Sequence, residues 1–266
     1  GGEVRTGARV QRILTRKGEA IAVRTEHADE ISATRCIVAD VAAPSLYLDL
    51  LEEDDVPPRI RAAMRDFPQG FGTFKMDWAL DGPCPFAHPD AARAAVVHAG
   101  DSVDDIQRVC SAVRDGELPE RPYLVIGQQS RADPTRAPEG KHTLWTYARV
   151  PSQVEGGWAR HRDRYADAVE ARIEELAPGF RERILARAIH APPDLEAQNE
   201  NLIGGDLGGG SARIRHQLFF RPVFPYFRYR TPVKRLYLGS SYTHPGAGVH
   251  GACGHNAARA ALRDLG

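Results

Sequence analysis

Residues 236–251 read LYLGSSYTHPGAGVHG, and an alanine-rich run follows them to residue 265. The pattern predicts a short apolar strand that runs into a glycine-rich turn, and a helix that begins after the turn. Gly246, Gly248 and Gly251 have the spacing GxGxxG. Glycines at such positions let backbone N–H groups approach a ligand closely, and a helix N-terminus adds partial positive charge. The stretch therefore predicts a contact surface for a bound molecule.

This turn differs from an ordinary dinucleotide-binding turn. That motif continues through its helix into a second strand, with an acidic residue about twenty positions further on. Residues 252–266 supply neither the second strand nor an acid at that distance. We therefore expect a glycine-rich turn of another kind.

Other motifs accompany the turn along the chain. They read GGEVRTGARV at residues 1–10, CIVAD at 36–40, NENLIGGD at 199–206, QLFFRP at 217–222 and YRTP at 229–232. Together with the turn, and in this order, they resemble the C-terminal portion of phytoene desaturase-like FAD-dependent oxidoreductases, within the flavin amine oxidase superfamily. The resemblance covers most of the chain. It implies FAD as the cofactor, and it implies that residues 1–40 lack the family's N-terminal GxGxxG unit, which holds the FAD pyrophosphate.

The resemblance also implies where the chain contacts the flavin. N–H groups near Val249 and His250 would face the N1–C2=O edge of the isoalloxazine, which becomes anionic on reduction. Ser240, after Gly239, stands where relatives often carry an acid beside the ribitol or pyrophosphate, so we expect a weaker contact there. Val10 resembles a valine whose backbone meets adenine, although an ordinary strand valine is an equal alternative. The expected cofactor-binding residues are Val10, Gly239, Ser240, His244, Pro245, Gly246, Gly248, Val249, His250 and Gly251.

Three other groups of residues are candidates for chemistry. His250 is a weak candidate for proton transfer because imidazole titrates near neutrality, with a purely structural histidine as the alternative. The cluster His244, His250, Cys253 and His255 matches no common zinc spacing, so we expect no metal site. Phe219, Arg221 and Tyr229 lie where aromatic and basic residues alternate, and we interpret them as the wall of a substrate pocket, with plain packing as the alternative.

Composition limits the classes of partner. Lys plus Arg equals Asp plus Glu at 35 each, so net charge gives no reason to expect nucleic acid. No apolar run is long enough to span a membrane. The four cysteines are widely spaced without a CxxC pair, which favours a reduced, cytoplasmic setting, with peripheral membrane association left open.

Hydrophobic periodicity predicts an α/β (α+β) protein. A mixed sheet flanked by helices is expected in a substrate-binding lobe at residues 54–232, and a partial FAD-binding lobe at residues 1–53 and 233–266. Strands are predicted within residues 9–39, 71–80, 94–99, 123–126, 143–150 and 184–189, and helices at 44–51, 57–67, 102–113, 157–177 and 192–201.

Taken together, these patterns predict the C-terminal part of an oxidoreductase that moves hydride between a small, largely apolar substrate and flavin. The 266-residue chain alone is expected to be inactive, not to retain FAD, and to self-associate or to pair with the missing N-terminal segment. A non-catalytic interaction domain and a flavin amine oxidase are the alternatives. The substrate and the electron acceptor stay open.

Overall fold

The computed structural model describes residues 2–266, which form two compact units. Unit 1 comprises Gly1–Gly70 and Leu207–Gly266, and unit 2 comprises Phe71–Asp206. Residues 54–70 and 207–232 thus group with the terminal segments, whereas the predicted lobes place them in the middle of the chain. Sheets and helices occur in both units, so the α/β (α+β) fold class is confirmed.

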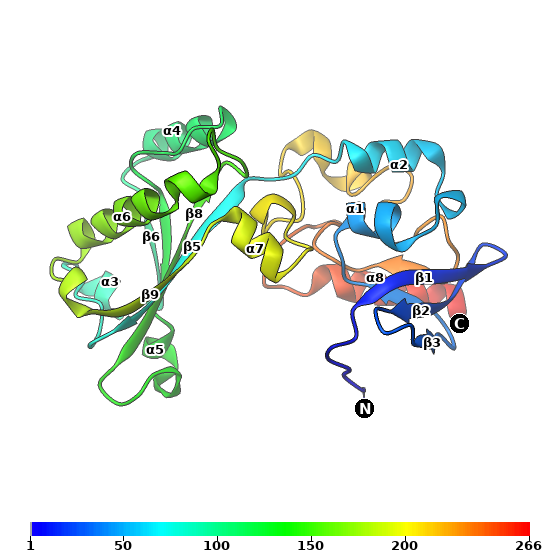
Figure 1. Ribbon diagram of the computed structural model, residues 1–266, viewed down its shortest axis with the longest axis horizontal. Helices are drawn as coiled ribbons and strands as arrows, with labels where there is room; N and C mark the ends of the chain where they lie inside the picture. Colours follow the sequence, from blue (N-terminus) through cyan, green and yellow to red (C-terminus); the bar gives the residue numbers. More distant parts are fainter. Residues whose placement is uncertain (1) are drawn as a thin grey trace. The chain divides into compact units, whose positions relative to one another are not determined.

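Unit 1 begins with a three-stranded antiparallel sheet in the order β1-β2-β3 (Figure 1). Its strands are β1 (Val10–Arg16), β2 (Glu19–Thr25) and β3 (Glu30–Ser32). The β1–β2 hairpin turns through Lys17 and Gly18, which both have positive φ. A two-residue turn of this hand matches the right-handed twist of the flanking strands. The strands lie within the predicted range, residues 9–39.

A two-stranded parallel sheet joins segments that are almost 200 residues apart. It pairs β4 (Ile37–Ala39) with β10 (Leu236–Leu238), and all three residues of β10 are buried. The Gly239 N–H donates to the Ala39 carbonyl at 2.8 Å and extends the pairing into the glycine-rich stretch. Distant segments therefore share one sheet, and both lie in the two ranges, 1–53 and 233–266, that were expected to form one lobe.

Three α-helices support these sheets in unit 1. α1 (Ala43–Ser45) continues into a π-helical turn, and α2 (Pro58–Arg65) begins at a proline and buries Ile60 and Met64. α8 (Ala252–Leu265) buries four small side chains, among them Ala257. A Cβ added to Gly239 would lie 3.3 Å from the Ala257 Cβ, so the glycine lets the helix approach β10 closely.

Unit 2 contains a five-stranded sheet in the order β6-β7-β8-β5-β9. The strands are β5 (Gly72–Leu80), β6 (Val96–Ala99), β7 (Leu124–Gly127), β8 (His142–Val150) and β9 (Ile184–His190). All four pairings are antiparallel, so the sheet is not the mixed sheet that was predicted. Periodicity places the strands correctly but carries no information about the direction of their partners.

The helices of unit 2 are α3 (Pro89–Arg93), α4 (Val103–Arg114), α5 (Gln129–Ala132), α6 (Trp158–Leu176) and α7 (Pro192–Gln198). The Ser102 hydroxyl accepts the Asp105 N–H at 3.1 Å and caps α4, which lies in the predicted helical range 102–113. α6 lies along one face of the sheet (Figure 1). Its buried stripe packs against Phe74, Met76, Trp78, Leu144 and Val150, which alternate along β5 and β8.

Two expectations from composition concern membrane-spanning helices and cysteine pairing. Within residues 2–266, none of the helices combines the length and the apolar character that crossing a bilayer requires. Cys36, Cys84, Cys110 and Cys253 are all unpaired. The cytoplasmic location itself stays a prediction.

Candidate functional site

The glycine-rich stretch leaves β10 through a closed turn. The Ser240 carbonyl accepts both the N–H of Thr243 at 2.9 Å and its hydroxyl at 2.8 Å. Thr243 is fully buried, and the Ser240 hydroxyl accepts the Tyr242 N–H at 3.3 Å. Ser240 is thus engaged in shaping the turn that carries the next residues outward.

The middle of the stretch is held by hydrogen bonds from other elements. The Tyr229 hydroxyl donates to the His244 carbonyl at 2.8 Å, and the Gly246 N–H donates to the Thr243 carbonyl at 2.8 Å. Pro245, in a cis peptide with His244, is exposed, whereas Gly246 is buried with φ of +98°. Only glycine adopts this backbone conformation without strain, so Gly246 has a structural reason to be glycine.

The last part of the turn is open to solvent. Gly248, Val249, His250 and Gly251 are all exposed, and Val249 is the most exposed large apolar residue of the described chain. Within residues 2–266, the backbone N–H groups of these four residues have no protein acceptor. The His250 Nδ1 accepts the Ala252 N–H at 2.9 Å at the start of α8, so this ring nitrogen is engaged with the helix.

A buried arginine joins this turn to the loop at residues 207–211. The Arg221 guanidinium is 3% exposed and donates to backbone carbonyls at five positions. Nη2 reaches Ser241 at 2.7 Å, Gly209 at 2.8 Å and Gly208 at 2.9 Å, while Nε reaches Thr243 at 3.3 Å and Nη1 reaches Ser211 at 3.4 Å. A Cβ on Gly246 would lie 3.3 Å from this guanidinium. Arg221 therefore positions the turn.

The other predicted substrate residues lie in different environments. Tyr229 is half-buried, accepts a hydrogen bond from Asn256 at 2.9 Å, and has a pKa that burial raises above its usual value. Phe219 is 54% exposed and packs edge-on against Phe227, with 5.0 Å between ring centroids. These contacts leave the predicted substrate pocket at Phe219, Arg221 and Tyr229 untested. Arg221 also lines a cavity of 330 Å³ beside Phe220.

Two other predicted groups can be placed. Val10 is the first residue of β1, pairs with Thr25, and so belongs to a different sheet from the one that leads into the turn. His244, His250, Cys253 and His255 do not converge, since no three His, Cys, Asp or Glu side chains gather as metal ligands within residues 2–266.

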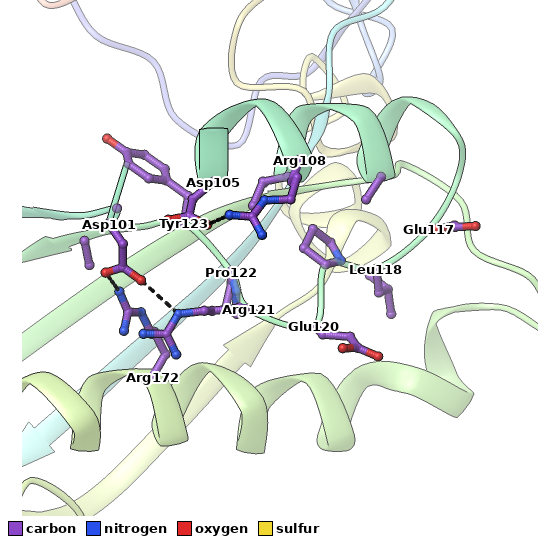
Figure 2. A pocket seen from close by; sticks show the side chains of 15 residues that line it. Asp101, Asp105, Arg108, Glu117, Leu118, Glu120, Arg121, Pro122, Tyr123 and Arg172 are labelled. Carbon is purple, nitrogen blue, oxygen red and sulfur yellow. Dashed lines mark hydrogen bonds and ion pairs between the residues drawn. The ribbon is translucent and has the colours of Figure 1, made fainter. Parts of the chain in front are cut away.

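Unit 2 holds a charged cavity of 420 Å³ that the sequence analysis missed (Figure 2). Arg172 of α6 is 5% exposed and donates to Asp101 at 2.5 Å and to Glu175 at 2.7 Å. Arg121 contacts the same two carboxylates at 3.0 and 2.8 Å. Hydrogen bonds from Arg172 and then Arg121 lower the pKa of Asp101. Each positive charge faces a negative one, so this ring of four residues neutralises itself.

Comparison with known proteins shows which proteins the chain is similar to. No family model matches the chain. The chain is 32% identical over 277 residues to pyridine nucleotide-disulfide oxidoreductase domain-containing protein 2 of Mus musculus, covering 98% of this chain and 46% of that protein. It is 28% identical over 264 residues to the neurosporene-forming phytoene desaturase of Cereibacter sphaeroides, covering 96% and 48%. The chain is thus similar to phytoene desaturase-like FAD-dependent oxidoreductases. It spans about half the length of the curated relatives it matches.

A solved structure shows the same fold. The chain aligns with cyclohexylamine oxidase from Brevibacterium oxydans with a TM-score of 0.57 and 14% identity, over 96% of this chain and 48% of that one. The similarity extends over both units of this phytoene desaturase-like chain. At this identity the similarity shows a shared fold.

Proposed function

We propose that residues 239–251 contact the flavin of an FAD-dependent oxidoreductase, and that this enzyme oxidises a largely apolar substrate by hydride transfer. The supporting observation is the row of four exposed backbone N–H groups at Gly248–Gly251, directly before α8. Unpaired N–H groups at a helix N-terminus suit a group that gains negative charge. The family resemblance identifies this group as the flavin.

The chemistry of the surrounding residues fits a reduced flavin. Residues 207–263 contain no Asp or Glu, so no carboxylate from this segment opposes an anionic ring edge. The Arg221 guanidinium lies behind Gly246, on the protein side of the turn, and adds positive charge. FAD, when bound, supplies the hydride-accepting ring. The chain's own residues would orient that ring and stabilise charge at its edge.

The two units receive different roles in this proposal. Unit 1 contains every predicted flavin-contacting residue and would be the partial FAD-binding lobe. Unit 2 would be the substrate-binding lobe. His250 is a weak candidate for moving a proton, because its Nδ1 accepts the Ala252 N–H and only Nε2 is left for a substrate.

Two alternatives differ in their requirements. A flavin amine oxidase would need a lysine near the flavin. The chain has four lysines, which are Lys17, Lys75, Lys141 and Lys234. None of them lies in the stretch 239–251. A non-catalytic interaction domain would need no ligand at the turn. Flavin binding that depends on the turn therefore separates the proposal from the interaction domain.

The variant Gly248→Val tests the flavin contact in a flavin-loaded protein that contains this chain. We expect loss of most bound flavin with little change in melting temperature. A Cβ at this position would lie 2.5 Å from the His250 ring, so the valine would displace that ring or shift the turn that carries the exposed N–H groups. Flavin absorbance per protein and Tm are measured in one preparation. Gly254→Ala is the matched control, because its Cβ meets nothing within 4 Å. Normal flavin content in Gly248→Val would assign the turn a structural role only.

We also expect the chain to self-associate. Phe219, Phe220 and Phe224 in unit 1 are each more than half exposed, and Val38 on β4 is 47% exposed. Within residues 2–266, β4 is paired only along the edge that faces β10. Monomers seldom leave apolar side chains and strand edges uncovered together. Light scattering at several concentrations checks this expectation, and a monomer at every concentration would contradict it.

A further inference from the structure

The face of the unit 2 sheet opposite α6 carries a row of flat side chains. Trp145, Tyr147 and Arg149 alternate along β8 and therefore project to the same face. The Trp145 and Tyr147 rings lie 5.8 Å apart and are parallel within 4°. The Arg149 guanidinium lies 5.4 Å from the centre of the Tyr147 ring. All three side chains are half-buried and lie next to one another along β8, and we call them the aromatic row.

Neighbouring strands hold the aromatic row in place. A Cβ on Gly127 of β7 would lie 2.1 Å from the Trp145 ring, so the indole rests directly on the glycine backbone. On the other side, Lys75 and Asp77 of β5 pair with Tyr147 and Trp145 and form an ion pair with each other. The charges beside the two rings are thus already compensated, and the rings remain the apolar part of the surface.

One end of the row carries a charge that is not compensated. The Arg149 Nη1 donates to the Thr73 hydroxyl at 3.0 Å. Within residues 2–266, no carboxylate lies within 4 Å of the Arg149 guanidinium. A half-buried guanidinium keeps its proton and favours a carboxylate partner, which it can bind through two parallel hydrogen bonds.

We propose that the aromatic row binds an apolar chain that ends in a carboxylate. The chain would lie along Trp145 and Tyr147, and its carboxylate would pair with Arg149. At about 3.3 Å per strand residue, the row from Trp145 to Arg149 is about 13 Å long, so the ligand is elongated. Calling this ligand a substrate rests on the proposed function. Its binding needs no flavin, so the two proposals can fail separately.

Binding of cis-parinaric acid, a conjugated fatty acid, tests the proposal with the 266-residue chain free of flavin. Its emission rises when it leaves water, which gives a dissociation constant, and its methyl ester is the uncharged comparison. We expect Arg149→Gln to weaken binding of the acid about tenfold, the size of one charge-assisted contact, and to leave the ester unchanged. Trp145→Ala should weaken both probes. Arg108→Gln, an exposed arginine of α4 that lines the charged cavity, is the matched control.

Four outcomes would overturn the proposal. The acid fails to bind, the acid and the ester bind the wild-type chain equally, both lose affinity equally in Arg149→Gln, or the control weakens the acid as much as Arg149→Gln does. If Trp145→Ala does not fold, Gly127→Ala replaces it, because its Cβ displaces the indole without removing it.

Discussion

Replacing Arg221 with glutamine should lower the free energy of unfolding of unit 1 by about 3–5 kcal/mol. The buried guanidinium donates to carbonyls at five positions, and glutamine can reach only one or two of them. A buried acceptor that loses its donor costs about 1–3 kcal/mol, and several would lose theirs at once. Loss of the carbonyl contacts would release the loop at residues 207–211 from the turn at 241–243.

The positions of the tryptophans allow the unfolding of the two units to be measured separately. Trp78, Trp145 and Trp158 are the chain's three tryptophans, and all of them lie in unit 2. Urea unfolding followed by tryptophan emission should therefore change little in Arg221→Gln, whereas the circular dichroism transition should shift to lower urea. Arg228→Gln is the control, because Arg228 is exposed and lies 5.3 Å from the Phe227 ring centre. A shift in Arg221→Gln no larger than in this control would contradict the positioning role of Arg221.

The purified 266-residue chain should be colourless. Residues 239–251 offer contacts to one edge of a flavin ring, while residues 1–40 contain no GxGxxG turn for the pyrophosphate. Each charge-assisted contact that is missing removes about 1.5–3 kcal/mol, so losing several weakens binding by orders of magnitude. The visible absorbance after gel filtration, with and without added FAD, measures retention. A stoichiometric flavin spectrum that survives gel filtration would contradict the prediction.

Local sequence signals predicted most of the elements. Alternation placed β5 and β8, and Ser102 marked the start of α4, because these signals depend on neighbouring residues. The glycines at 246–251 correctly indicated an open turn before a helix. Family resemblance, carried by motifs of fixed order, supplied the proposed ligand of that turn, which composition and periodicity do not identify.

Contacts between distant residues were not predictable in the same way. The contacts of Arg221 are one case, since nothing in QLFFRP indicates that its guanidinium would reach carbonyls 10–22 residues away. Arg172 and Asp101 are 71 residues apart, and no local pattern links them. The aromatic row was visible as alternation at Trp145, Tyr147 and Arg149, but the charges beside it depend on strand register. Register follows from the assembled sheet.

The pairing of β4 with β10 has a consequence for how the protein folds during synthesis. β4 leaves the ribosome long before its partner, since Leu236 follows Ile37 by 199 residues. At 5–20 residues per second, the delay is roughly 10–40 s. Unit 2 is contiguous, so its five strands can assemble within that interval. Until Leu236–Leu238 has been synthesised, β4 has no partner strand. During this interval we expect the nascent chain to be most prone to aggregation and to chaperone binding.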